Sequence, residues 1–186
     1  MTKELQKKTE IGIVIKQDIL ENLAKIVYLG IGSNLGNKKT NIEQAKYKLE
    51  NYNIKILKCS SYYESKSWPN PKNPKFINIV VKVKTKLSPI KLLKICHLIE
   101  ISLGRKRYKK NSPRTCDIDI IDYDQKTLIN KKEKLILPHP KMTQRNFVLL
   151  PLFEIDKSWK HPKSKINIVE LIGSLEIIDL RSIKQI

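Results

Sequence analysis

The hydrophobic pattern between residues 26 and 123 predicts four β-strands. Each predicted strand is a short run in which apolar and β-branched residues dominate or alternate with polar ones. The third run alternates most clearly, because Ile77, Ile79 and Val81 fall on one face while Asn78 falls on the other. The predicted strands are residues 26–31, 54–64, 76–86 and 115–123.

Two segments between these strands carry the spacing of an amphipathic helix. In the first, Thr40 and Glu43 match a capping box at the helix start. The second has Ser88 as its predicted N-cap, Pro89 at the first helical position, and Gly104 at its end. The apolar faces consist of Ile42, Ala45, Leu49 and Tyr52 in the first helix, and of Leu92, Cys96, Ile99 and Leu103 in the second.

The resulting order of elements is strand, helix, strand, strand, helix, strand. This βαββαβ order predicts an α+β, ferredoxin-like fold, in which two helices cover one face of an antiparallel sheet. The C-terminal additions are a helix at residues 145–154, interrupted at Pro151, and a short strand at residues 175–180. We expect one domain over residues 25–186, preceded by an extension, residues 1–24, to which no role is assigned.

Composition indicates a globular, intracellular protein of 186 residues. No run reaches the ~18 apolar residues of a membrane span, and the start of the chain lacks the apolar centre of a secretory signal. Cys59, Cys96 and Cys116 are widely separated among apolar or β-branched neighbours. We expect a cytoplasmic protein whose cysteines are reduced thiols packed in the core.

The formal net charge of +19 suggests nucleic-acid binding, because basic surfaces attract phosphates. Lysines are scattered over the whole chain, however, which favours a composition bias over a nucleic-acid patch. Arginine is rare, and four of the five arginines lie in one stretch: Arg105, Arg107, Arg114 and Arg145. Since a planar guanidinium binds phosphate oxygens in a bidentate way, we expect the chemistry in that stretch.

The sharpest chemical signal is the Pro-Arg-Thr-Cys-Asp-Ile-Asp segment at residues 113–119. Because side chains alternate along a strand, Asp117 and Asp119 point to one face, ~7 Å apart along the strand, and Ile118 points to the other. Two such carboxylates suit a pair of divalent cations that holds both ends of a phosphoryl displacement. Mg²⁺ is the expected metal, since it binds carboxylates together with substrate phosphates and water.

Plain structural interpretations compete with each of these signals. A bare Asp-x-Asp is more often a solvated strand face than a metal site. His139, between two prolines, is equally compatible with a rigid loop, and Phe76, Phe147 and His97 are compatible with core positions. The chain has no P-loop, and its glycines after the first strand lack the spacing of a dinucleotide-binding turn.

A set of five segments carries a family resemblance. They are Gly32-Ser33-Asn34-Leu35-Gly36, Phe76-Ile77-Asn78, Glu100 through Gly104-Arg105-Lys106-Arg107, residues 113–119, and Leu137-Pro138-His139 followed by Arg145-Asn146-Phe147. In order and approximate spacing they resemble the 6-hydroxymethyl-7,8-dihydropterin pyrophosphokinase family, over about residues 26–160. The Pro-Arg-Thr-x-Asp-x-Asp segment is highly specific to that family, whose fold is the ferredoxin-like one.

The resemblance implies an enzyme of folate synthesis that transfers pyrophosphate from ATP to hydroxymethyl-dihydropterin and releases AMP. It implies that Asp117 and Asp119 bind two Mg²⁺ ions, and that Arg105 and Arg114 neutralise the phosphates during transfer. The residues implied on the ATP side are His97, Glu100, Arg107, Lys134, His139 and Arg145. The residues implied at the pterin are Phe76 and Phe147, on its two faces, and Asn78 and Ser65. The implied partners are these small-molecule substrates, with no nucleic acid or membrane, and we expect a monomer.

Three departures from the family pattern concern the nucleotide side. Asn111 and Ser112 stand where the family usually has an aromatic and a small residue, in a loop that looks one residue shorter. Pro140 follows the histidine, where a tyrosine is common, and Lys134 replaces a common nucleotide-contacting arginine. These departures concern nucleotide packing and leave the predicted metal site unchanged.

An RNA-binding ferredoxin-like module is the alternative from another functional class. Such a module needs an aromatic-rich strand on which bases stack, and none of the predicted strands has one. Acidic residues in the fourth strand would also repel phosphate unless a metal intervenes. A further open alternative is that residues 1–24 are a remnant or linker of a folate-pathway fusion.

Overall fold

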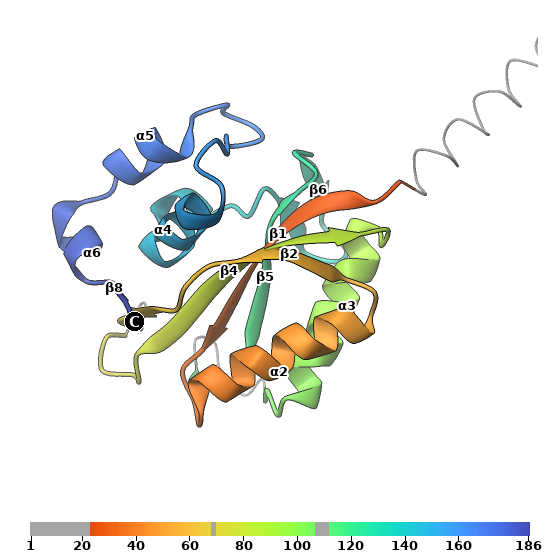
Figure 1. The fold of residues 1–186 in the computed structure, drawn as a ribbon, viewed down its shortest axis with the longest axis horizontal. Helices are drawn as coiled ribbons and strands as arrows, with labels where there is room; N and C mark the ends of the chain where they lie inside the picture. The colour runs from red at the N-terminus through yellow and green to blue at the C-terminus, as the bar shows by residue number, and fades with distance from the viewer. Residues whose placement is uncertain (1–22, 68–69, 107–111) are drawn as a thin grey trace, which may run out of the picture.

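The computed structural model describes residues 23–67, 70–106 and 112–186, and shows a mixed α/β fold with helices on both faces of a sheet (Figure 1). The predicted N-terminal extension lies almost entirely outside the described residues, and so does Arg107. Within the described ranges, no helix combines the length and apolar character needed to cross a membrane.

The main sheet is antiparallel in every pairing between its strands. Its strands are β1 (Lys25–Ser33), β2 (Lys55–Cys59), β3 (Tyr63–Ser65), β4 (Phe76–Thr85), β5 (Asp117–Tyr123) and β8 (Lys184–Gln185). They are arranged in the order β5-β1-β4-β3-β8, and β2 also pairs with β4. The predicted strands therefore exist, but the second of them, residues 54–64, is divided into β2 and β3.

Helices cover both faces of this sheet (Figure 1). On one face lie α2 (Lys38–Asn51) and α3 (Pro89–Ser102), and on the other lies α4 (Asn146–Ile155), against which α5 (Ile168–Gly173) packs. The chain then continues through α6 (Ile177–Arg181) to β8. A hairpin of β6 (Leu128–Asn130) and β7 (Leu135–Leu137) and the 3-10 turn η1 (Met142–Gln144) connect β5 to α4.

The ends of α2 and α3 test the predicted caps. α3 begins after Ser88, whose hydroxyl accepts a backbone hydrogen bond, and Gly104 follows its end with φ of 80°, as predicted. The predicted capping box of Thr40 and Glu43 is wrong. Asn37 caps α2 instead, because its Oδ1 accepts from the Thr40 N–H at 3.2 Å, so that Thr40 lies inside the helix.

The break between β2 and β3 is made by hydrogen bonds from distant parts of the chain. Ser60 N–H donates to Val80 O, and Ser60 Oγ accepts from the Val80 N–H, each at 3.0 Å. Ser61 N–H and hydroxyl donate to Glu154 Oε1 of α4, at 3.0 and 2.7 Å. Since Glu154 follows Ser61 by 93 positions, a local hydrophobic pattern could not reveal this break.

Two predictions for the C-terminal part are wrong. Pro151 does not interrupt α4, because the helix is held against the sheet by side chains such as Leu152, which is fully buried. Residues 175–180 do not form a strand. The Leu180 N–H bonds to Glu176 O at 3.1 Å, which closes the helical turn of α6.

The sheet separates two hydrophobic cores. Ile118 of β5 points to the core under α2 and α3, which also contains Cys96 and Cys116, while Ile121 belongs to the core under α4. The prediction of buried thiols is correct for these two cysteines. It is wrong for Cys59, which is exposed, because β2 lies at the border of the sheet.

Candidate active site

Asp117 and Asp119 project from β5 on the face opposite to Ile118, as the strand alternation predicts. Their side chains are 26% and 40% exposed, whereas Ile118 is 3% exposed. The sheet therefore presents two carboxylates on its outer strand, next to the segment that leads into β5.

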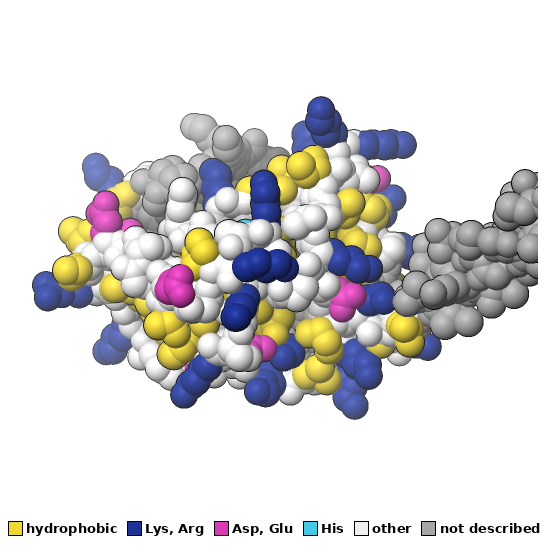
Figure 2. Space-filling view, turned by 90° about the horizontal axis from the view of Figure 1, so that it is seen from above, with side chains coloured by type: hydrophobic (Ala, Val, Ile, Leu, Met, Phe, Trp, Pro, Cys, Tyr) yellow, Lys and Arg dark blue, Asp and Glu magenta, His cyan; other side chains and the backbone are white. Residues whose placement is uncertain are grey.

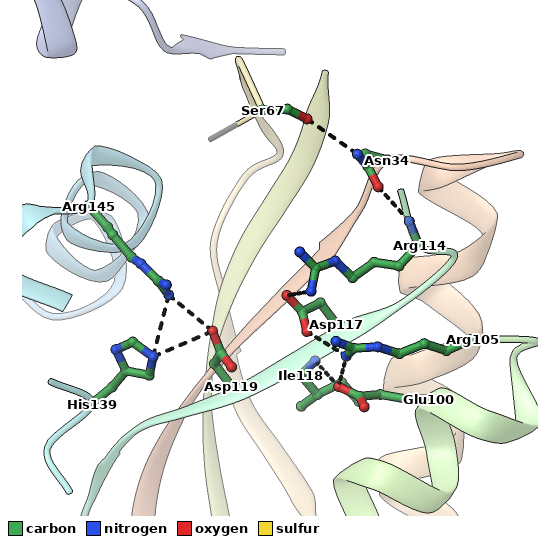
Figure 3. Close-up of polar contacts among 10 residues, drawn as sticks. All are labelled: Asn34, Ser67, Glu100, Arg105, Arg114, Asp117, Ile118, Asp119, His139 and Arg145. Carbon is green, nitrogen blue, oxygen red and sulfur yellow. Dashed lines mark hydrogen bonds and ion pairs between the residues drawn. The ribbon is translucent and has the colours of Figure 1, made fainter. Parts of the chain in front are cut away.

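Asp117 is paired with two arginines (Figure 3). Arg105 Nη1 lies 2.5 Å from Asp117 Oδ1, and Arg114 Nη1 lies 3.3 Å from Oδ2. Arg105 Nη1 also lies 2.5 Å from Oε1 of Glu100, a buried residue of α3. The same Glu100 oxygen accepts from the Ile118 N–H at 2.8 Å. One buried carboxylate thus positions both Arg105 and the start of β5.

Asp119 faces a second basic group, at the end of the segment that leads into α4 (Figure 3). Arg145 Nη1 lies 3.2 Å from Asp119 Oδ2, and His139 Nε2 lies 3.8 Å from the same oxygen. Burial and the charge of Arg145 lower the pKa of His139 to about 4, so the imidazole is neutral at pH 7. Desolvation by the surrounding protein and the charge of Asp117 raise the pKa of Asp119, although its side chain is 40% exposed and Arg145 acts in the opposite direction. A bound cation would counteract that increase in pKa.

Two buried polar atoms beside this cluster have no hydrogen-bond partner among the described residues: Nε of Arg114 and Oγ1 of Thr115. A buried donor without a partner costs ~1–3 kcal/mol, and such atoms are usually satisfied by water or a ligand. An oxygen of a phosphate group has the charge and the acceptor capacity that Arg114 Nε requires.

The two phenylalanines expected at the pterin each lie against an arginine of the cluster. The guanidinium carbon of Arg114 lies 5.6 Å from the centre of the Phe76 ring. The guanidinium carbon of Arg145 lies 5.5 Å from the centre of the Phe147 ring. An aromatic side chain therefore adjoins the charged cluster on the β4 side and on the α4 side.

Asn78 and Ser65 form a buried polar pair on neighbouring strands. Asn78 Nδ2 donates to Ser65 Oγ at 3.0 Å. Gly32 of β1 is the register partner of Asn78, and a Cβ added to Gly32 would lie 2.7 Å from Asn78 Oδ1. The absence of a side chain at Gly32 therefore leaves room for this amide.

The other residues expected on the nucleotide side are His97, Lys134 and Arg107. His97 lies on α3, one turn before Glu100, and Lys134 lies between β6 and β7 with φ of 54°. In the part of the chain that the structure describes, Lys134 forms no ion pair with either aspartate of the cluster. Arg107 lies outside that part.

Asn34 and Ser67 received no role from the sequence, although their side chains hydrogen-bond next to Arg114 (Figure 3). The signal available was an asparagine three positions after a predicted strand, within a Gly-Ser-Asn-Leu-Gly segment. That signal also suits an ordinary turn.

A cavity of about 560 Å³ lies away from this cluster, between η1, α5 and α6. His161, Ile166 and Leu175 are among its lining residues, and none of the residues predicted for the site lines it. We assign the site to the charged cluster, because ionisable groups and an unpartnered buried donor converge there.

The chain is similar to proteins of one known family. The family described as 7,8-dihydro-6-hydroxymethylpterin-pyrophosphokinase (HPPK) matches residues 28–157. The 2-amino-4-hydroxy-6-hydroxymethyldihydropteridine pyrophosphokinase of Aquifex aeolicus is 41% identical over 136 residues, which are 73% of this chain and 83% of that protein. The enzyme of the same name from Synechocystis sp. is 38% identical over 149 residues, which are 80% of this chain and 75% of that protein.

Some relatives are much longer than this chain. The folic acid synthesis protein fol1 of Pneumocystis carinii is 40% identical over 157 residues, which are 84% of this chain but 21% of that protein. A crystal structure of HPPK-DHPS from Plasmodium falciparum has a TM-score of 0.68 at 16% identity, and covers 89% of this chain and 47% of that chain. From the family match and the 38–41% identity to these enzymes, we conclude that the chain belongs to the 7,8-dihydro-6-hydroxymethylpterin-pyrophosphokinase family of folate synthesis.

Proposed function

We propose that this protein transfers the terminal pyrophosphate of ATP to the hydroxyl group of 6-hydroxymethyl-7,8-dihydropterin. The hydroxyl oxygen bonds to the β-phosphorus, the bond from that phosphorus to the oxygen of the α-phosphate breaks, and AMP leaves, while the hydroxyl proton passes to solvent. The observation that carries the proposal is the pair Asp117 and Asp119, surrounded by arginines at the border of the sheet.

We propose that two Mg²⁺ ions bind at the site, with Asp117 and Asp119 as their protein ligands. Across the described residues, no group of three or more His, Cys, Asp and Glu side chains is arranged to hold a metal ion. Two carboxylates are nevertheless a suitable set for Mg²⁺, which completes its coordination with substrate phosphates and water. Bound there, Mg²⁺ supplies charge neutralisation at the triphosphate.

The arginines of the cluster have separate proposed roles. Arg105 and Arg114 stabilise the negative charge that develops as pyrophosphate is transferred, since both already lie against Asp117. Glu100 contributes to transfer indirectly, because its carboxylate forms an ion pair that holds the Arg105 guanidinium in place. Arg145 and His139 line the nucleotide on the Asp119 side. His97, Lys134 and Arg107 are the other proposed nucleotide contacts.

The pterin is proposed to lie between Phe76 and Phe147. A flat ring that stacks on aromatic side chains gains ~1–3 kcal/mol per contact in nucleic-acid complexes, and a pterin has a comparable π-face. Asn78, with Ser65 behind it, offers hydrogen bonds to the edge of the ring. In this arrangement the hydroxymethyl group points toward the two aspartates.

A ferredoxin-like topology, one domain over residues 25–186, a monomeric state and a cytoplasmic location complete the proposal. The pairings of β1 with β5, of β1 with β4 and of β4 with β2 support the topology. RNA binding is not favoured: Figure 2 shows Lys and Arg side chains separated by hydrophobic and neutral surface on the face that it displays, without a continuous basic stripe.

The proposal is tested by incubating purified protein with ATP, MgCl₂ and hydroxymethyl-dihydropterin and separating the nucleotides by chromatography. We expect AMP to appear in proportion to the pterin consumed, and no AMP when the pterin is omitted or the metal is chelated. Formation of ADP in place of AMP would identify attack on the γ-phosphorus and would contradict the proposal.

A further inference from the structure

Asn34 is the first residue after β1, and its side chain links two segments that flank the charged cluster (Figure 3). It is 3% exposed, whereas the next residue, Leu35, is 47% exposed. A buried carboxamide is stable only when its oxygen and its nitrogen both find hydrogen-bond partners. The partners of Asn34 therefore indicate its role.

One end of Asn34 is bonded to the segment that leads into β5. Asn34 Oδ1 accepts from the Arg114 N–H at 2.7 Å, and the Asn34 N–H donates to Arg114 O at 3.1 Å. The guanidinium of this same Arg114 reaches Asp117. The two bonds to Asn34 thus set the position of the backbone from which that guanidinium extends.

The other end is bonded to the segment that leads into β4. Asn34 Nδ2 donates to Pro74 O at 3.1 Å and to Ser67 Oγ at 3.3 Å. The Ser67 hydroxyl in turn donates to Pro74 O at 2.6 Å. Phe76 follows shortly after Pro74, so this end of Asn34 supports the backbone that carries Phe76.

Only a carboxamide of this length satisfies both ends. The Arg114 N–H needs an acceptor, whereas Pro74 O and Ser67 Oγ on the other side accept from an N–H donor. Aspartate would keep the acceptor but would place a negative oxygen against a carbonyl oxygen. Alanine would leave the Arg114 N–H without its side-chain acceptor, and Pro74 O would keep only the Ser67 hydroxyl as donor.

We propose that Asn34 is a positioning residue, which holds the segment before Phe76 at a fixed distance from the segment at Arg114. This inference rests on the proposed function, in which the pterin lies beside Phe76 and the phosphates of ATP lie beside Arg114. Loss of the link on the Pro74 side misaligns the hydroxyl and the β-phosphorus without removing any group that contacts ATP. We therefore expect a lower kcat and a higher KM for the pterin, with the affinity for Mg-ATP close to that of the wild type.

Hydrogen–deuterium exchange tests the link without turnover. In Asn34→Asp, residues 70–76 should exchange faster while the Arg114 N–H stays protected, because the acceptor is retained. In Asn34→Ala, both should exchange faster. The control is Asn167→Ala, which removes a comparable bond at the start of α5, where Asn167 Oδ1 accepts from the Glu170 N–H at 2.9 Å. It should change neither segment.

Kinetics provide the second readout. Asn34→Asp should lower kcat by about 10- to 100-fold, the effect expected of a small misplacement of reacting groups. Ser67→Ala should have a smaller effect, because the bond from Asn34 to Pro74 remains. The double variant should be little worse than Asn34→Asp, since both changes act on one link.

The proposal is overturned if Asn34→Asp keeps wild-type exchange at residues 70–76 and wild-type kcat. It is also overturned if exchange rises uniformly over the chain, which would indicate general destabilisation. Should Asn34→Ala fail to fold, Asn34→Asp and Ser67→Ala still decide the question. If the wild-type protein forms no AMP, the proposed function fails, and the exchange measurements still decide whether the link exists.

Discussion

Nη1 of Arg105 lies 2.5 Å from Oε1 of Glu100, whose side chain is only 2% exposed. Because Glu100 is shielded from water, Arg105→Ala removes an ion pair that compensates its buried negative charge. We expect this loss to lower the free energy of unfolding by about 3 kcal/mol. We expect the double variant Arg105→Ala/Glu100→Gln to recover much of that stability but no activity. Urea denaturation and the AMP assay separate the two effects. Recovered activity in the double variant would contradict the role of Arg105 at the phosphates.

Asp117 and Asp119 should behave as one unit. Either Asp117→Ala or Asp119→Ala should lower kcat by ~10²- to 10³-fold at saturating Mg²⁺, as for the loss of one preorganised electrostatic group. The double variant should be little worse than the poorer single one, because both residues serve the same metal assembly. Kinetic losses that simply multiply would argue for independent roles. Asp119→Ala should not reduce stability, since the like charge of Asp117 on the same strand face disfavours the ionised form of Asp119.

Phe76→Ala and Phe147→Ala distinguish stacking residues from core residues. If the side chains stack on the pterin, each variant should weaken pterin binding by ~1–3 kcal/mol and leave ATP binding nearly unchanged. If they are core residues, the variants should instead lose ~3–5 kcal/mol of stability and melt early. Calorimetric titration with pterin and a thermal melt of the same two variants decide between these outcomes.

Gly32→Ala should impair pterin binding more than it impairs folding. The new Cβ would lie 2.7 Å from Asn78 Oδ1, so the amide has to leave its place beside Ser65. Gly30→Ala is the matched control on the same strand, because its Cβ would meet Ile121, at 3.3 Å from Cδ1, and no residue proposed at the pterin. We expect a raised KM for the pterin in the first variant and a near-normal KM in the second. Equal KM values in both would remove Asn78 from the pterin site.

Asp156 should make the stability of the fold depend on pH in the acidic range. Lys82 Nζ and the Tyr28 hydroxyl donate to Asp156 Oδ2, at 2.8 and 2.5 Å. Burial opposes the ionised form, but these bonds outweigh it and lower the pKa of Asp156 to about 2. Since the unfolded carboxyl titrates near ~3.9, the contribution is complete above that pH and disappears as pH falls toward about 2.

Asp156→Asn should therefore reduce the free energy of unfolding at neutral pH, and by progressively less as the pH falls below ~4. Chemical denaturation of wild type and variant across this range measures the difference. Asp179→Asn, on the exposed α6, is the control and should show no such convergence. A difference that stays constant with pH would exclude Asp156 as the titrating group.

Elements with a strong local pattern could be predicted from the sequence. β4 and α3 were found with nearly correct bounds, because alternation and the Ser88-Pro89 start signal are properties of neighbouring residues. The start of α2 was misjudged, since Asn37 and Thr40 both have side chains that can cap a helix, and the backbone conformation at Asn37 decides between them. The break after β2 depends on the hydrogen bond from Ser61 to Glu154 of α4. These two residues are too far apart in sequence for a local pattern to reveal the contact.

For the site, strand alternation alone predicts that Asp117 and Asp119 share one face of a strand, because the two-residue period is a local property of extended backbone. The pairing of each arginine with its carboxylate depends on the tertiary structure. The packing of α3 against β5 brings Arg105 to Asp117, and the segment through η1 brings Arg145 to Asp119. The link through Asn34 likewise spans 80 positions to Arg114. The sequence does not specify distances between segments that are far apart along the chain. The pairing of β1 with β4 and β5 fixes these distances.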